Sequence, residues 1–284
     1  MKKNKIFQYI LLFPVLFYSI FLIALPLVYI FVISFFETDS YGGMNVTFTL
    51  HNYFELFDSS YVKIFFRSIG ISFITTILCI ILAYPFVLAV SHKTKKTQQI
   101  LMTLVMVPFL TNSLIRMYGW IVLLRKYGVI NQILLEANII GQPIPFMYNT
   151  FGVIIGMVYT LLPFMILPLY SAVCTIERPL LEAASDLGAS KWKTFTKIIL
   201  PQTLSGLFNG SIMVFTPALG YFFIIDILGG GKAMILGNLI KNQFLTARNW
   251  PFGAAISVFL IFITTVLIGV YRKMGGKMDE LSGG

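Results

Sequence analysis

Six long stretches of this sequence carry almost no charge, and this feature limits the fold more than any other. A helix that crosses the hydrocarbon core of a bilayer needs about 20 consecutive, mostly apolar residues. The stretches that meet this requirement are 10–36, 68–90, 100–124, 150–176, 199–225 and 252–271. Runs of this length predict helices, because a helix satisfies its own backbone polar groups inside lipid. We therefore expect an all-α integral membrane protein with six transmembrane helices.

The composition and the first run agree with this class. The chain is 57% hydrophobic and only 11% charged, which is too little charge for the surface of a soluble protein of 284 residues. The first run follows a basic head that contains Lys2, Lys3 and Lys5, as a signal peptide would. It is too long for the apolar part of a signal peptide, and no small-residue cleavage site precedes the polar "ETDSYGG". We expect it to be a retained span.

The distribution of Lys and Arg predicts the orientation. With the N-terminus in the cytoplasm, thirteen of the 21 basic residues fall in inner segments and seven in outer segments. This bias favours six helices with both termini cytoplasmic, in a single transmembrane domain over residues 1–284. It also accounts for the net charge of +10 without any nucleic-acid partner. Residues 177–198 then form a cytoplasmic loop.

The apolar runs offer little chemistry. Arg116 is the one charged residue inside them, and it is either an anchor near the outer interface or a pathway residue. The apolar runs contain no carboxylate that could relay a proton, which argues against a proton-coupled transporter. The two histidines, His51 and His92, lie far apart, so we expect no metal site. Nothing in these patterns predicts a catalytic residue.

The segment Asp226–Met234, "DILGGGKAM", resembles a phosphate-binding loop but does not match it. That loop requires Gly-x-x-x-x-Gly-Lys followed by Ser or Thr. Here Ala233 follows the Gly-Lys pair, and Asp226 stands where the first glycine belongs. We expect the chain to bind no ATP and no other cofactor by itself.

The loop at 177–198 has the pattern of two short helices. Pro179 suits the first turn of a helix, Gly188 suits its end, and Ser190 is a plausible cap for a second helix. The resulting knob carries small residues with two carboxylates, Glu182 and Asp186, and several lysines. On these grounds alone it is either a docking knob for a partner protein or an amphipathic hairpin that rests on lipid.

The same loop fits the pattern E-A-A-x-x-x-G-x(9)-I-x-L-P at every fixed position. These positions are Glu182, Ala183, Ala184, Gly188, Ile198, Leu200 and Pro201. The pattern resembles the signature of permease subunits in bacterial ABC importers. The stretches "LLPFMILPLYSAV" and "MILGNLIKNQFLTARNWPFGAA" are similar to those of spermidine/putrescine importer permeases, and the similarity runs from about residue 60 to 272.

The resemblance implies the fold of a type I ABC importer permease in the bacterial cytoplasmic membrane, with the loop at 177–198 as its coupling loop. The chain would form half of a polyamine pathway without being an enzyme. The implied partners are a dimer of ATP-binding subunits, which hold ATP and Mg, a second related permease, an extracytoplasmic polyamine-binding protein and membrane lipid. The residues implied to dock onto the ATP-binding subunit are Glu182, Ala183, Ala184, Asp186, Leu187 and Gly188.

A polyamine pathway needs aromatic faces and carboxylates for ammonium groups. The candidates are Tyr159, Tyr221, Phe222 and Asp226. Aromatic residues that face lipid are equally ordinary in such helices, and Asp226 is also explained as the end of a span. The outer segment Met234–Trp250 is expected to be helical, either as a re-entrant gate or as a landing surface for the binding protein.

Two other functions remain open at this level. In the first, the chain is a permease of an ABC importer for a different solute, such as another amine, an organic anion or iron. Alternatively, the chain is a stand-alone secondary transporter or channel, and its cytoplasmic knob serves another purpose.

Overall fold

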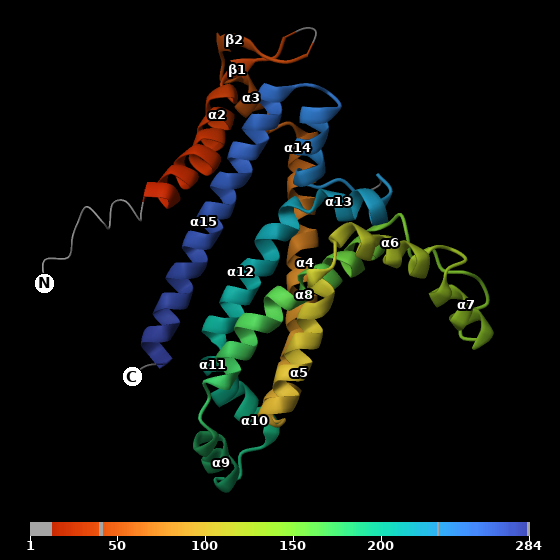
Figure 1. Cartoon of the computed structure of the whole chain (residues 1–284), viewed down its shortest axis with the longest axis vertical. Helices are drawn as coiled ribbons and strands as arrows, with labels where there is room; N and C mark the ends of the chain where they lie inside the picture. Colours follow the sequence, from red (N-terminus) through yellow and green to blue (C-terminus); the bar gives the residue numbers. More distant parts are fainter. Residues whose placement is uncertain (1–12, 40–41, 232, 283–284) are drawn as a thin grey trace, which may run out of the picture. The chain divides into compact units, whose positions relative to one another are not determined.

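The computed structural model describes residues 13–39, 42–231 and 233–282 and is almost entirely helical (Figure 1). It divides into two compact units. The first unit contains Met1–Val62 and Leu239–Ile263, and the second contains Lys63–Asn238 and Thr264–Gly284. Residues 10–12 of the first expected span lie outside the described residues.

Four helices in the described residues are long and apolar enough to cross a membrane without interruption. They cover Phe13–Ile33, which includes η1 (Ser19–Ala24) and α2 (Leu25–Ile33), then α4 (Ser59–Ser91), α8 (Thr150–Cys174) and the Trp250–Val270 part of α15 (Trp250–Ser282). Two bent helix pairs raise this number to six if each pair is one span. The expected helical membrane fold is therefore confirmed, with one short sheet added in the first unit.

The third expected span, 100–124, is not one straight helix. α5 (Lys95–Met106) continues into the 3-10 turn η2 (Val107–Leu110), and α6 (Ser113–Leu124) follows after a break. The segments Lys95–Leu110 and Ser113–Glu136 make an angle of 94°. Pro108 removes a backbone donor, and Thr111 is extended at ψ 157°. The Asn112 side chain then caps α6 by accepting from the Leu114 N–H at 2.8 Å. Arg116 therefore lies in the first turn after a sharp bend and not far along one continuous helix.

The fifth expected span, 199–225, is also interrupted. The pair Lys191–Gln202 and Leu204–Gly220 bends by 68° at Thr203. The pieces are α10 (Lys191–Thr194), the π-turn η3 (Phe195–Ile199), α11 (Leu200–Gln202), α12 (Leu204–Gly220), α13 (Phe222–Ile224) and the π-turn η4 (Ile225–Gly229). Pro217 lies inside α12, and Tyr221 leaves helical geometry at ψ 63°. Such breaks free backbone groups that other parts of the protein must then satisfy.

In the first unit, polar contacts around a small antiparallel sheet hold neighbouring elements together. Strands β1 (Phe36–Glu37) and β2 (Asn45–Phe48) pair, and α3 (His51–Glu55) follows. The buried Asn52 amide of α3 donates to the carbonyls of Ser34 at 3.0 Å and Phe36 at 2.8 Å. These bonds tie α3 to the end of α2, where the chain leaves its first span.

The core of the second unit is centred on α8. Met157, Leu161, Met165 and Leu169 are fully buried along one face of this helix. α8 makes its most extensive helix–helix contact with α12, which runs beside it (Figure 1). The contact is close because Gly206 of α12 lies against α8 and leaves no room for a side chain.

The expected outer helix is present as α14 (Leu236–Leu245). Its Asn238 is buried and donates to Asp226 Oδ1 at 2.6 Å and to the Phe222 carbonyl at 3.1 Å. Ser68 of α4 accepts from the Leu236 N–H at 2.9 Å, and Gly237 lies against the Gly220 backbone. The start of α14 therefore satisfies backbone and side-chain groups exposed by the break after α12.

Replacing Asn238 with Leu is expected to lower the free energy of unfolding by about 1–3 kcal/mol, because the Phe222 carbonyl loses a donor in a buried setting. Thermal unfolding of the purified chain in detergent measures the effect. The control is Gln132→Leu, at an exposed amide on α7 (Val129–Glu136). Equal stability of the two variants would show that the Asn238 contacts do not hold the start of α14.

Candidate functional site

The segment 177–198 folds as a hairpin of two short helices, which we call the α9–α10 hairpin. α9 (Arg178–Asp186) begins after the extended residue Glu177, and Pro179 occupies its first turn as expected. α10 begins after Ser190, whose hydroxyl accepts from the Lys193 N–H at 3.3 Å. The sequence rules for helix starts thus hold at both positions.

The turn between the two helices is closed by its own hydrogen bonds. Gly188 has φ +72°, in the left-handed region. Its N–H donates to the Ser185 carbonyl at 2.9 Å, and the Ala189 N–H donates to the Ala184 carbonyl at 2.9 Å. This pair of bonds is the Schellman arrangement, which requires a residue that tolerates positive φ. The hairpin therefore has a defined shape without any partner.

The base of the hairpin is fixed to α4. The Phe195 ring meets the Tyr84 ring edge-on at 5.4 Å, and Trp192 lies 5.8 Å from Phe195. The Tyr84 hydroxyl also shares a 2.7 Å hydrogen bond with the Thr203 hydroxyl at the 68° bend. Displacement of the hairpin therefore acts directly on α4 and on the start of α12.

Most of the expected docking residues are exposed on the hairpin. Glu182, Ala183, Asp186, Leu187 and Gly188 are exposed, and Leu187 is 88% accessible at the end of α9. Ala184 is different, since it is buried at 8% exposure.

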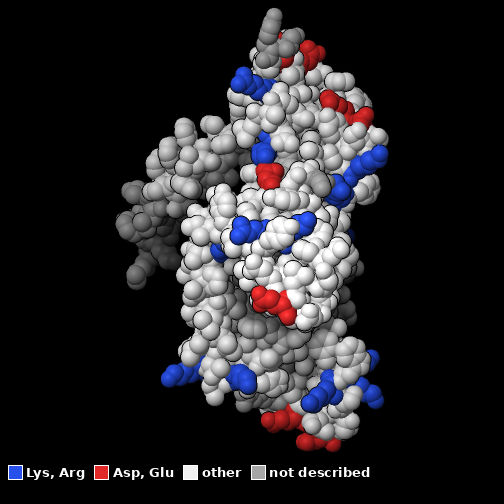
Figure 2. Space-filling model, turned by 90° about the vertical axis from the view of Figure 1, so that its right-hand side faces the viewer, with Lys and Arg blue, Asp and Glu red and all other residues white. Residues whose placement is uncertain are grey.

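Charged side chains of both signs gather at the end of the molecule where α9 and α10 lie (Figures 1 and 2).

A cavity of about 590 Å³ lies between the hairpin and the neighbouring ends of α4, α5 and α8. Residues that line it include Leu88, His92, Gln98, Cys174, Leu181 and Glu182. The buried Gln98 side chain donates to the carbonyls of Ser91 and Lys93 and accepts from the Tyr170 hydroxyl at 2.9 Å. Gln98 thus fixes the turn between α4 and α5 to α8, while the space beside α9 remains open.

The pathway candidates divide into an aromatic group and an acidic group. Tyr159 of α8 contacts Trp120 edge-on at 5.4 Å, and its ring lies 5.8 Å from the Arg116 guanidinium carbon. Tyr221 is half-buried, and Phe222 is 39% exposed at the break after α12. The carboxylate of Asp226 accepts from Asn238, so part of its hydrogen-bonding capacity is used within the chain.

The sequence did not show which side chains surround Arg116. It lies on the first turns of α6, beside the rings of Phe109 and Tyr159, because the chain breaks between Leu110 and Ser113. The polar triplet Thr111-Asn112-Ser113 in the middle of an apolar run is the signal that indicates this break.

Comparison with known proteins identifies relatives over almost the whole chain. The family model described as "Binding-protein-dependent transport system inner membrane component" matches residues 81–279. The spermidine/putrescine transport system permease protein PotB of Salmonella typhimurium is 40% identical over 286 residues, which cover 99% of this chain and 100% of that protein. The protein of the same name from Escherichia coli is 42% identical over 258 residues, or 91% and 94% of the two chains.

The fold also matches a solved structure. A chain from the crystal structure of a bacterial alginate ABC transporter, in complex with an alginate pentasaccharide-bound periplasmic protein, superposes with a TM-score of 0.79. The match covers 97% of this chain and 96% of that one at 17% identity, and at this identity it bears on the fold alone.

Proposed function

Because this chain belongs to the inner membrane components of binding-protein-dependent transport systems, we propose that it forms half of the pathway of an ATP-driven polyamine importer. The family is that of multi-pass permeases of ABC importers in the bacterial plasma membrane. Such a permease works with an ATP-binding subunit and a substrate-binding protein. The observation that carries the polyamine assignment is the identity of 40% and 42% to two proteins named as spermidine/putrescine permeases.

The proposed complex contains a second, related permease, two ATP-binding subunits and an extracytoplasmic polyamine-binding protein. Both termini and the α9–α10 hairpin lie on the cytoplasmic side, in line with the bias of Lys and Arg in the loops. Residues 1–284 act as one permease domain. The chain itself is non-catalytic, and the partner subunit holds ATP and Mg.

The hairpin serves as the lever of this machine. Its exposed residues Glu182, Ala183, Asp186, Leu187 and Gly188 dock onto the ATP-binding subunit. When ATP draws the two ATP-binding subunits together, each hairpin moves as a rigid body, because its turn and both helix starts are hydrogen-bonded. Coupling then requires only that ATP favours one of two arrangements of the helices.

The contact of Phe195 with Tyr84 and the hydroxyl pair of Tyr84 and Thr203 pass the displacement to α4 and α12. Ala184 is buried and so offers almost no surface to a partner. Its role in docking is therefore to keep the exposed face in place.

The substrate pathway is assigned to the region where α12 ends and α6 begins. Tyr159, Tyr221 and Phe222 supply aromatic faces, and Asp226 supplies a carboxylate. Aromatic faces attract ammonium groups, and a polyamine carries several of them on an apolar stem. Selectivity for the substrate rests mainly with the binding protein, since the outer loops have no excess of acidic residues.

The test is reconstitution of the chain with its ATP-binding subunit, second permease and binding protein in proteoliposomes that contain ATP. We expect saturable uptake of radiolabelled spermidine, competition by unlabelled putrescine, and no uptake when ATP is omitted. The matched control lacks only the ATP-binding subunit. Spermidine uptake in that control would instead support a stand-alone transporter.

The cargo is tested separately in the same vesicles. If ATP hydrolysis is stimulated by a binding protein loaded with another solute, and spermidine is neither taken up nor competes, the permease assignment stands and the polyamine assignment fails.

A further inference from the structure

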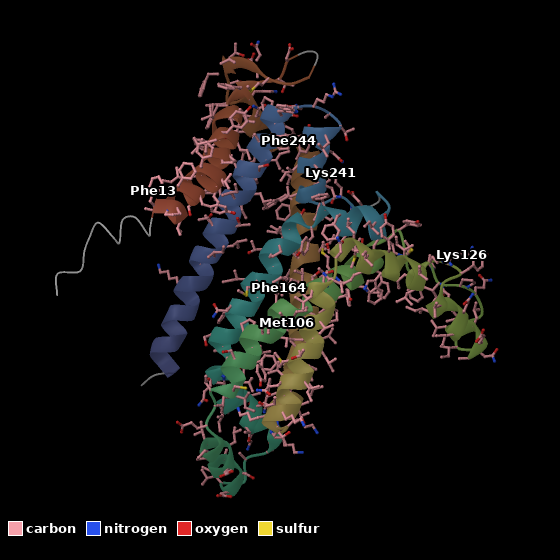
Figure 3. The ribbon with its side chains drawn as sticks, viewed as in Figure 1. Phe13, Met106, Lys126, Phe164, Lys241 and Phe244 are labelled. Carbon is pink, nitrogen blue, oxygen red and sulfur yellow. The ribbon has the colours of Figure 1, made fainter. Side chains whose placement is uncertain are left out.

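Arg116 lies within a cluster of four aromatic rings, which we call the aromatic cluster: Phe109, Trp120, Tyr159 and Phe164. Its guanidinium carbon is 5.6 Å from the centre of the Phe109 ring and 5.8 Å from that of Tyr159. The other two rings support these two, since Phe164 (Figure 3) meets Phe109 edge-on at 5.1 Å and Trp120 meets Tyr159 at 5.4 Å. The rings come from η2, α6 and α8 of the second unit.

The cation lies against the rings of Phe109 and Tyr159, and it also interacts electrostatically with Tyr221. The Arg116 Nε is buried and has no hydrogen-bond partner. Within the part of the chain that the structure describes, no carboxylate forms an ion pair with Arg116. The Arg116 side chain as a whole is half-buried, and the unmet donor at its buried Nε is costly. Arg116 is therefore seated in a cation-binding site without the bonds that would lock it there.

We propose that the aromatic cluster is a binding station for an organic ammonium group, and that Arg116 is its resident occupant, which the incoming substrate displaces. The proposal rests on the polyamine pathway proposed above and assigns a specific site within it. Aromatic faces attract guanidinium and ammonium groups by the same electrostatic mechanism, so the two cations compete for the same rings. Their mutual repulsion makes joint occupancy unfavourable.

The position of Arg116 in the chain makes this exchange feasible. The residue lies one turn after the 94° break, on a helix that begins at a side-chain cap rather than in a continuous span. Entry of an ammonium group between Phe109 and Tyr159 would therefore be linked to departure of the Arg116 side chain. In the resting state the site is filled, and it opens only when a substrate competes for it.

The test measures binding of radiolabelled spermidine to the purified complex of both permeases and the ATP-binding subunits, with the binding protein left out. When Arg116 occupies the rings for part of the time, the apparent affinity for spermidine is the intrinsic affinity multiplied by the fraction of time that the rings are free. We therefore expect Arg116→Ala to bind about tenfold more tightly than the wild type, because the competing cation is gone. Arg116→Lys keeps a cation at the rings and should bind as weakly as the wild type.

The matched control is Lys126→Ala. Lys126 also places its cation near a ring, 5.7 Å from Tyr127, but both residues are exposed on the loop between α6 and α7, well apart from Phe164 (Figure 3). This variant should leave spermidine affinity unchanged. Arg116→Gln repeats the charge removal with a polar side chain, should the alanine variant fail to fold.

Three results would overturn the proposal. One is an affinity of Arg116→Ala and Arg116→Gln equal to or weaker than that of the wild type, while the wild-type complex takes up spermidine normally. Another is loss of the second permease from both purified variants, which would make Arg116 an assembly contact. Absence of ATP-driven spermidine uptake by the wild type is the third, and it alone also overturns the proposed function.

Discussion

A proline at position 188 abolishes ATP-driven uptake while the chain remains folded and inserted in the membrane. Gly188 has φ +72°, whereas proline is fixed near about −65°, and proline also lacks the N–H that donates to Ser185. The turn of the α9–α10 hairpin therefore cannot close, and the exposed residues of α9 are no longer presented in one fixed arrangement. The change lies outside the buried core, since an added Cβ at this position meets nothing within 4 Å.

The measurements are uptake and ATP hydrolysis in proteoliposomes, together with the amount of chain in the membrane. Gly188→Asn is the matched control, because asparagine tolerates the left-handed conformation and an open position accommodates its side chain. It should retain most of the uptake. Loss of uptake in both variants would indicate that the partner approaches too closely for any side chain, and normal uptake in Gly188→Pro would remove the hairpin from the coupling mechanism.

Ala184→Phe should also abolish uptake, but by another route. Ala184 is 8% exposed, so a large side chain at this position must push apart the groups that bury it and distort the hairpin. Normal uptake by this variant, at wild-type amounts of chain in the membrane, would contradict the role assigned to the rigid hairpin.

Replacement of Gly206 by leucine should disrupt the packing of α8 on α12. A Cβ at this position would lie 2.5 Å from the Ala172 Cβ and 2.7 Å from the Pro168 carbonyl oxygen. Backbone atoms cannot rotate away as a side chain can, so the two helices must separate. Overpacking of this kind costs about 1–3 kcal/mol, occasionally more. The fall in thermal unfolding temperature of the purified chain measures it.

Gly210→Leu should have a smaller effect, since the closest atom to its added Cβ is the flexible Met165 sulfur at 2.7 Å. Gly269→Leu is the control, at an exposed glycine of α15 with open space around it. If all three variants unfold at the same temperature, close helix approach at Gly206 does not contribute to stability.

Local rules predicted the hairpin well. Pro179, Gly188 and Ser190 each fix one end of a short helix through a constraint that acts within a few residues, so the sequence alone is sufficient. The six apolar runs likewise indicated membrane spans, because length and hydropathy are properties of each run by itself.

The bends were harder to predict, because apolar length gives no information on whether a run stays straight. The run 100–124 is apolar on both sides of the triplet Thr111-Asn112-Ser113, and this short polar signal alone does not show that the Asn112 side chain caps a new helix at Leu114. The burial of Ala184 was equally hard to predict, since helical spacing shows which residues share a face but not which face is covered. The surroundings of Arg116 were hard to predict for both reasons. The residue follows a bend, and one of the rings beside it comes from a different helix, α8.

The self-closed turn at Gly188 has a consequence for assembly. A segment that must become ordered on contact with its partner loses conformational entropy at that moment, which weakens the complex. Here the left-handed glycine and its two backbone bonds complete that ordering while the permease folds. If the ATP-binding subunit docks on the hairpin as proposed, it meets a preorganised surface, and repeated release and rebinding between transport cycles need no refolding of the contact.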